Sequence, residues 1–390
     1  MESQNKTARD FLIITGATLL LSILIWLPHY FQLKLFNLDF SNGINTIYRN
    51  YDGVEYITIA KSFYNKTVIS GLPFSFPANY YASHFPGYSI FILILSPLLG
   101  FLKSMLAVSI IFTILSSFAF YMLVKNLGLA KNSLYLSLLF LVLPARWLVV
   151  HSVGSAEPIF IFFTIASLLL FMRYEKEKSS LLIWGSAVAA AMAQLSRPPG
   201  LLLFLSLSLF IHIKLFKALK ISGIKKAILD HLNYYPLLLV PLTLLGIFLL
   251  YSINLGDFWG YFHSGDNIHL GLPYQVFNKA APWVGEIWLE DVIYVFLLGF
   301  LGGFYLIKQK LFILGTFVLV YLLATICVAH RDIARYSLPI FPFLLIAFEK
   351  VLSSREFKIA LLIILPAIYL YAQNFILGNT APIPNLNLLN

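Results

Sequence analysis

Apolar residues gather into long runs along this chain, and short polar connections separate the runs. Twelve runs approach the length of a membrane-crossing helix, and they centre on residues 11–28, 86–102, 104–124, 133–150, 157–172, 180–195, 199–213, 234–253, 290–307, 311–329, 336–349 and 359–376. A helix across a ~30 Å hydrocarbon core needs about 20 apolar residues. Spanning strands would need a closed barrel with an alternating pattern, which this sequence does not have. The pattern predicts an all-α, polytopic transmembrane protein, with residues 1–390 as a single integral membrane domain.

The composition agrees with this prediction and excludes some kinds of site. Hydrophobic residues make up 59% of the chain and charged residues 11%, whereas soluble domains carry about 25% charged residues. Too few charges remain to cover a soluble globule of this size. The single cysteine, Cys327, excludes an intrachain disulfide and a cysteine metal cluster.

The net charge of +10 arises from clusters of Lys and Arg at every second connection, at residues 125–131, 173–178, 214–226, 308–310 and 350–358. Such clusters mark the cytoplasmic side of a membrane protein, so they need not indicate nucleic acid binding. The connections 151–156, 196–199, 254–289 and 330–336 then lie outside.

Two counts of spans fit these charges. If 86–102 crosses the membrane there are twelve helices, and the N-terminus lies outside. If it does not cross, there are eleven, the N-terminus is cytoplasmic and residues 31–103 form a first outer loop. Pro97 and Gly100 interrupt 86–102, which favours a helix along the interface and about eleven spans.

The first loop contains the stretch from Arg49 to Ala60, with Asp52 and Glu55 as its carboxylates. If a helix starts at Asp52, that residue is a favoured N-cap, so a purely structural role is an alternative to a functional one. The loop ends in an aromatic-rich segment around His84, which would also suit an aromatic belt at the membrane interface.

Three other outer connections carry candidate residues. Glu157 stands at the mouth of a run, where the helix dipole alone would favour it. Arg197 follows in the next outer connection, and the connection after 329 carries Arg331, Arg335 and Tyr336. Cations on the outer side run against the positive-inside trend and suggest a bound anion such as a phosphate; pairing with Asp332 or lipid headgroups is the alternative.

The second long polar stretch, residues 254–289, is long enough to act as a lid. His263, Asp266 and His269 within it do not match an established metal-ligand spacing. The sequence contains no Walker loop, GxSxG elbow or HExxH pair, so a nucleotide-driven pump and common hydrolase chemistry are unsupported.

These motifs together resemble the GT-C glycosyltransferases, polytopic enzymes that use polyprenyl-phosphate sugars. The stretch Tyr51-Asp52-Gly53 followed by Tyr56, Ile59 and Ala60, and then His84-Phe85-Pro86-Gly87-Tyr88, is similar to the GPI mannosyltransferase 2-like branch. There, Trp stands in place of Tyr51, and Gly87 and Ser89 also depart from the pattern. Looser matches follow at Ser155–Glu157, at Ser196-Arg197-Pro198 and from Arg335 to Pro339. The likeness covers about residues 10–200 well and the rest in outline.

The resemblance implies a fold with juxtamembrane helices in the first outer loop, a cytoplasmic N-terminus and an active site on the outer or lumenal face. It implies transfer of a hexose, with mannose as the sugar expected from the family, to a glycan, lipid or protein acceptor. It also implies inversion at the anomeric carbon, with Asp52 as the catalytic base. Glu157 and Glu55 would orient the acceptor or a divalent cation such as Mg or Mn. The family contains both metal-using and metal-independent members. The donor phosphate would contact His84, Arg197, Arg331, Arg335 and Tyr336. The alternative is a polytopic transporter or lipid flippase, which would need charged or broken helices near mid-membrane.

Overall fold

The computed structural model describes residues 2–50, 52–72, 76–222, 224–225, 231–265, 270–278, 286–330, 332–381, 383 and 386–389. Helices dominate this part of the chain. The strands found within it, β1 (Lys34–Leu35) and β2 (Leu38–Asp39), form a small antiparallel hairpin in which Lys34 pairs with Asp39. The predicted all-α class is confirmed.

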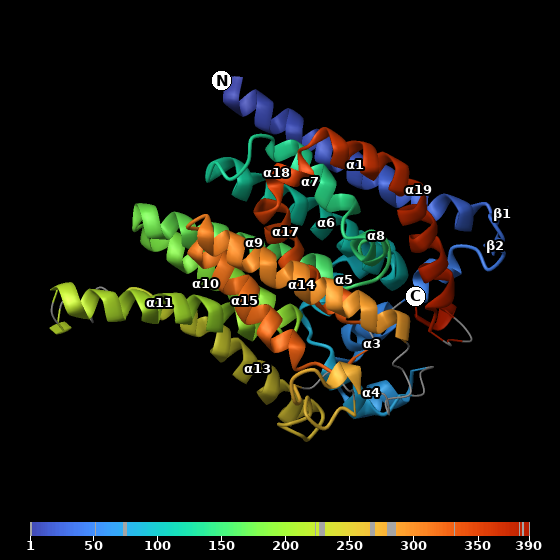
Figure 1. The fold of residues 1–390 in the computed structure, drawn as a ribbon. Coiled ribbons are helices and arrows are strands. Elements are labelled where there is room, and N and C mark those ends of the chain that lie inside the picture. The colour runs from blue at the N-terminus through green and yellow to red at the C-terminus, as the bar shows by residue number, and fades with distance from the viewer. Residues whose placement is uncertain are drawn as a thin grey trace. The chain divides into compact units, whose positions relative to one another are not determined.

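The chain divides into two compact units. The first contains residues 1–162, 248–265 and 349–390, and the second contains residues 163–247 and 266–348. The boundaries between residues 162 and 163 and between residues 247 and 248 each fall inside a helix. Figure 1 labels elements of both units where there is room.

The first unit is built around long apolar helices. Its elements are α1 (Glu2–Tyr30), α2 (Asn45–Tyr48), α3 (Gly53–Ser62), α4 (Lys66–Ser70), η1 (Ala78–Ser83), α5 (Gly87–Leu99), α6 (Phe101–Asn126), α7 (Ser133–Val142), α8 (Ala145–Val150), the start of α9 (Glu157–Glu177), the end of α13 (Leu239–Asn254), α18 (Glu349–Leu352), α19 (Arg355–Gly378) and η5 (Leu386–Leu389). Helix α19 runs beside α1 (Figure 1), where Gln373 Nε2 donates a 2.9 Å hydrogen bond to the Ile25 carbonyl.

The first loop folds into the short helices that the sequence predicts. From α2 through α5 the loop adds five helical segments before the long helix α6 begins at Phe101. Helix α3 is buried along nearly its whole length, from Gly53 to Ala60. A buried α3 can hold side chains in fixed positions far better than an exposed loop could.

The second unit contains the remainder of α9 and α13 together with α10 (Ser180–Ser196), α11 (Gly200–Ser222), η2 (Tyr235–Leu238), η3 (Gln275–Phe277), α14 (Glu286–Lys308), α15 (Phe312–Ile326), α16 (Ile333–Tyr336), η4 (Leu338–Ile340) and α17 (Phe341–Ala347). Helices α14 and α15 pack closely. A Cβ added to Gly299 or Gly303 would lie 2.7 Å from a methyl carbon of Leu322 or Leu319, so this GxxxG pair serves helix packing.

Seven helices of the described residues are long and apolar enough to cross a membrane: Asn5–Tyr30, Phe101–Asn126, Glu157–Glu177, Gly200–Lys220, Tyr235–Asn254, Leu289–Lys308 and Arg355–Gly378. The other five predicted runs form shorter apolar helices. One of them, 133–150, is interrupted at Pro144 and becomes α7 and α8, because proline cannot donate the helical hydrogen bond. Helix α5 has 13 residues, about 20 Å of helix, which is short for a ~30 Å core. The count of about eleven spans stays a prediction.

Candidate functional site

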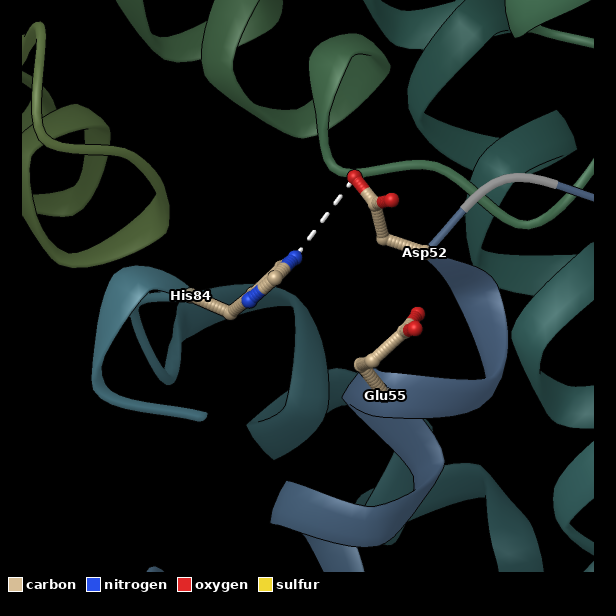
Figure 2. Close-up of side chains that lie close together, drawn as sticks. All are labelled: Asp52, Glu55 and His84. Atoms are coloured by element: carbon tan, nitrogen blue, oxygen red, sulfur yellow. Dashed lines mark ion pairs between the residues drawn. The ribbon is translucent and has the colours of Figure 1, made fainter. Parts of the chain in front are cut away.

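Asp52 stands at the N-cap position of α3, as the sequence predicts, but its side chain does not act as a cap. The Asp52 carbonyl accepts the first helical hydrogen bond, from Tyr56 N at 3.1 Å, whereas the carboxylate makes no capping hydrogen bond. Figure 2 shows this carboxylate turned toward His84, with Oδ2 3.5 Å from His84 Nε2. The simple capping explanation of Asp52 is therefore wrong.

Glu55 completes a group of three around this point. It lies three residues after Asp52, so its side chain falls on the same face of α3. One potential ligand atom from each of Asp52, Glu55 and His84 lies within 4.8 Å of the other two. Figure 2 shows the three side chains close together. Glu55 is buried, the His84 side chain is 8% exposed and the Asp52 side chain is 35% exposed. The group therefore has two enclosed members and one that solvent reaches.

His84 is held on several sides. The Tyr64 hydroxyl donates a 2.6 Å hydrogen bond to the His84 carbonyl, and the Ser83 hydroxyl lies 2.8 Å from His84 Nδ1. The ring of Tyr56 meets the imidazole edge to face, with 5.2 Å between centroids. These contacts fix the ring with Nε2 directed at Asp52.

Glu157 begins α9, as predicted, and is fully buried. Its carboxylate accepts a hydrogen bond from the Ser155 hydroxyl. The Ser155 amide in turn donates to the hydroxyl of Tyr88 at 3.1 Å, and Tyr88 donates to the Met105 carbonyl at 2.7 Å. The aromatic segment that follows His84 thus anchors the connection that carries Glu157.

In the second unit the structure brings Arg197 and Tyr336 together. The Arg197 guanidinium lies over the Tyr336 ring, with 5.8 Å from Cζ to the centroid. Arg335 precedes Tyr336 in α16, and all three residues are buried. Arg331, also predicted here, lies outside the described residues. A buried guanidinium on an aromatic face is suited to an anion, since it is weakly hydrated and always charged.

Sequence reasoning did not identify Tyr64 or Ser83. Ser83 could have been noticed as the neighbour of His84, whereas no local pattern identifies Tyr64, which acts across 20 residues. In the predicted lid, Asp257 Oδ2 lies 2.8 Å from His263 Nδ1. Asp266 and His269 lie outside the described residues, and the lid itself stays a prediction.

Comparisons with known proteins agree with this architecture. Residues 91–262 match the family model of dolichyl-phosphate-mannose-protein mannosyltransferases. Among solved structures, the chain is similar to the crystal structure of ArnT from Cupriavidus metallidurans in the apo state, with a TM-score of 0.54 and 14% identity over 98% of this chain and 68% of that one. A sequence search of curated proteins gave no match.

The structural likeness establishes the fold, and the family match covers the middle of the chain, from α5 to the segment after α13. The match is to protein mannosyltransferases, and it leaves the predicted GPI mannosyltransferase 2-like branch untested. The chain is thus similar to ArnT in fold, and less than half of it, residues 91–262, is similar to the dolichyl-phosphate-mannose-protein mannosyltransferase family.

Proposed function

We propose that this protein transfers a hexose, with mannose as the sugar, from a polyprenyl-phosphate donor to a hydroxyl group of a glycan, lipid or protein acceptor. The family match supports the donor class, because the matched family is described by a lipid-phosphate-mannose donor. The single observation that carries the site is the Asp52 carboxylate, which stands at a helix N-terminus yet is directed away from the cap toward His84.

In the proposed step, the acceptor oxygen attacks the anomeric carbon while the bond from that carbon to the phosphate oxygen breaks. The electron pair of that bond leaves with the polyprenyl phosphate, and Asp52 accepts the hydroxyl proton as general base. A single displacement inverts the anomeric centre. Asp52 suits the role of base because 35% of its side chain is exposed, so an acceptor can reach it.

The departing phosphate needs cations. We assign this role to Arg197, Arg335 and Arg331, because guanidinium groups bind phosphate through charge-assisted hydrogen bonds. Tyr336, whose ring lies under the Arg197 guanidinium, would contact the same phosphate. Glu157, buried with Ser155, is assigned to orienting the acceptor. Placing the reaction on the outer or lumenal face is part of the same proposal and is supported by the lysine-rich connections. The cytoplasmic N-terminus is supported by the eleven-span count and by the family resemblance.

The test is sugar transfer by purified protein in liposomes, offered a panel of radiolabelled polyprenyl-phosphate sugars. Wild type should release label only from the mannose donor, and Asp52→Asn should lower the rate at least about 100-fold, the usual contribution of a general base. Asp39→Asn is a matched control, since Asp39 is an exposed carboxylate of the same loop. Full activity in Asp52→Asn would refute the base. No turnover of any donor by wild type would favour the transporter alternative.

A further inference from the structure

We propose that the exposed face of helix α11 binds an anionic phospholipid, with the lipid phosphate on Lys217 and Lys220 and the acyl chains along the apolar residues that precede them. The site lies at the lysine-rich end of the helix, on the side that the charge pattern predicts to be cytoplasmic. This lipid site is independent of the proposed transfer reaction, because none of its residues is assigned to that reaction.

The apolar half of the site is a stripe of exposed side chains along α11. Among the seven candidate spans of the described residues, α11 is the least enclosed, since only 17% of its most apolar 18-residue stretch is buried inside the protein. The stripe consists of residues that are each between 46% and 64% exposed: Leu205, Leu209, Ile213 and Phe216. Their spacings of four, four and three residues place them on one helix face.

The length of the stripe fits one leaflet of a bilayer. Eleven steps of 1.5 Å separate Leu205 from Phe216, which gives about 17 Å of helix. Half of a ~30 Å hydrocarbon core is about 15 Å. The stripe can therefore cover the acyl chains of a single lipid, and the residues that follow it lie at the depth of the headgroup.

Two lysines continue the same helix face beyond the stripe. Lys217 follows Ile213 by four residues and Lys220 follows Phe216 by four, and both lysines are exposed. The chain has no acidic residue from the start of α11 until Asp230. The face thus presents two positive charges at headgroup depth, where the long lysine stems let the ammonium groups reach a lipid phosphate.

A third lysine secures this end of the helix. The Lys214 ammonium contacts the Glu175 carboxylate of α9 and donates a 2.9 Å hydrogen bond to the Tyr234 hydroxyl. Tyr234 donates to the same carboxylate, and Lys178 Nζ lies 3.2 Å from it. Because two lysines share one carboxylate, the cluster keeps a positive charge. It also holds the helix turn before Lys217 in place.

The helix dipole explains only part of this arrangement. It favours cations within the last turn of a helix, and α11 ends at Ser222, so the dipole accounts for Lys220 but not for Lys217. Helix α14 provides an internal comparison, because it has an exposed stripe with the same spacing: Ile293, Leu297, Leu301 and Phe304. There, Tyr305 stands in the place of Lys217, and Lys308 in the place of Lys220. Only α11 of these two helices has the lysine pair.

The experiment measures lipid binding directly. Detergent-purified, delipidated protein is titrated with phosphatidylglycerol or with phosphatidylcholine of the same acyl chains, and bound lipids are counted by native mass spectrometry. Wild type should bind its first phosphatidylglycerol about 30-fold more tightly than phosphatidylcholine, since each lysine near an anionic headgroup contributes about fivefold in affinity. The double variant Lys217→Gln/Lys220→Gln should bring this ratio close to one. Lys308→Gln, at the matching position of α14, is the control and should keep the wild-type ratio.

Measurements on wild type alone guard against variants that fail to fold. Phosphatidylglycerol should raise the melting temperature of the delipidated protein more than phosphatidylcholine does, because the more tightly bound ligand stabilises the folded state further. In 1 M NaCl, where the Debye length is about 3 Å, the difference should disappear.

Three results would overturn the proposal. Equal affinity of wild type for the two lipids would do so, and it would leave the lysines to an acidic protein partner. An unchanged ratio in the folded double variant would show that the phosphate binds elsewhere. An equal loss in Lys308→Gln and in the double variant would mean that general surface charge, and not the face of α11, selects the lipid.

Discussion

Gly53 and Gly154 pack backbone against backbone. A Cβ on Gly53 would lie 3.0 Å from the Gly154 carbonyl oxygen and 3.1 Å from its Cα, and a Cβ on either glycine would meet the Met105 sulfur. Gly53 directly follows Asp52, and Gly154 stands three residues before Glu157. Two segments that are 101 residues apart in the sequence thus come together within the first unit, and only residues without a side chain permit that approach.

Gly154→Ala should therefore displace the segments that carry Asp52 and Glu157, although Gly154 itself has no proposed role in the reaction. The new methyl group would collide with Met105 and force the two segments apart, at a cost of about 1–3 kcal/mol in unfolding free energy. The expected result is a lower melting temperature and at least about a tenfold loss of transfer rate. Gly16→Ala is the control, because a Cβ there meets no atom within 4 Å. Equal effects of the two substitutions would contradict the packing argument.

Ser155→Ala tests the support of Glu157. Removing the hydroxyl takes a hydrogen bond from a fully buried carboxylate, and hydrogen bonds to charged groups are worth about 1.5–3 kcal/mol. Because Glu157 is assigned to the acceptor, KM for the acceptor should rise about 10-fold or more while the KM for the donor stays near its wild-type value. Ser155→Thr should restore the acceptor KM, and Ser70→Ala, at an exposed serine of α4, should leave it unchanged. A rise in donor KM instead would refute the assignment.

Tyr81 predicts a dependence of stability on alkaline pH. Burial raises its pKa to about 12, the Thr58 hydroxyl lowers it in part, and the charge of Glu55 raises it further. The unfolded phenol has a pKa of about 10, so above pH 10 the unfolded chain loses this proton before the folded chain does. The contribution of Tyr81 to the free energy of unfolding is fully present below pH 10. It decreases as the pH rises toward 12, by about 2 kcal/mol in total.

Melting temperatures of Tyr81→Phe and wild type, measured from pH 8 to 12, check this expectation. The variant should lose less stability than wild type above pH 10, while Tyr30→Phe, at a tyrosine that is 72% exposed, should follow wild type. Parallel curves for Tyr81→Phe and wild type would contradict the raised pKa.

Asn50 ties the Asp52 segment to α19. Its side-chain amide donates a 2.7 Å hydrogen bond to the Ile376 carbonyl, and Asn50 is fully buried. Asn50→Asp replaces this donor by a carboxylate that faces the carbonyl, so unfolding free energy should fall by at least about 2 kcal/mol. Thermal unfolding and protease cleavage within residues 379–383 provide the measurement. Asn5→Asp, at an exposed position, should change neither.

Much of the fold could be predicted from the sequence because apolar runs in a membrane protein must become helices. The start of α9 at Glu157 followed from local signals, whereas the short helices of the first loop followed from the family resemblance; the structure has both. The break at Pro144 was not predicted, although proline gave a local reason for it.

The arrangement of the site was harder to predict, because it depends on contacts between distant residues. Asp52, Glu55 and His84 were each predicted as candidates: Asp52 as a base, Glu55 as a residue that orients the acceptor or a divalent cation, and His84 as a phosphate contact. Their convergence depends on the turn of η1 and on Tyr64, which bonds the His84 carbonyl across 20 residues. The Gly53–Gly154 contact likewise leaves no trace in local sequence, since a glycine beside an aspartate is equally common in an ordinary turn.

The pairing of residues 49–50 with residues 380–381 has a consequence for biosynthesis. Ala381 N donates a 2.9 Å hydrogen bond to the Arg49 carbonyl, and Thr380 forms a β-bridge with Asn50. At about 5–20 residues per second, a ribosome adds residue 381 tens of seconds after residue 50. During that interval the nascent chain carries Asp52, Glu55 and His84 without the backbone partners that secure the preceding segment. The proposed activity is thereby tied to synthesis of the segment that follows α19, and a chain released earlier would enter the membrane with its first loop unpaired at residues 49–50.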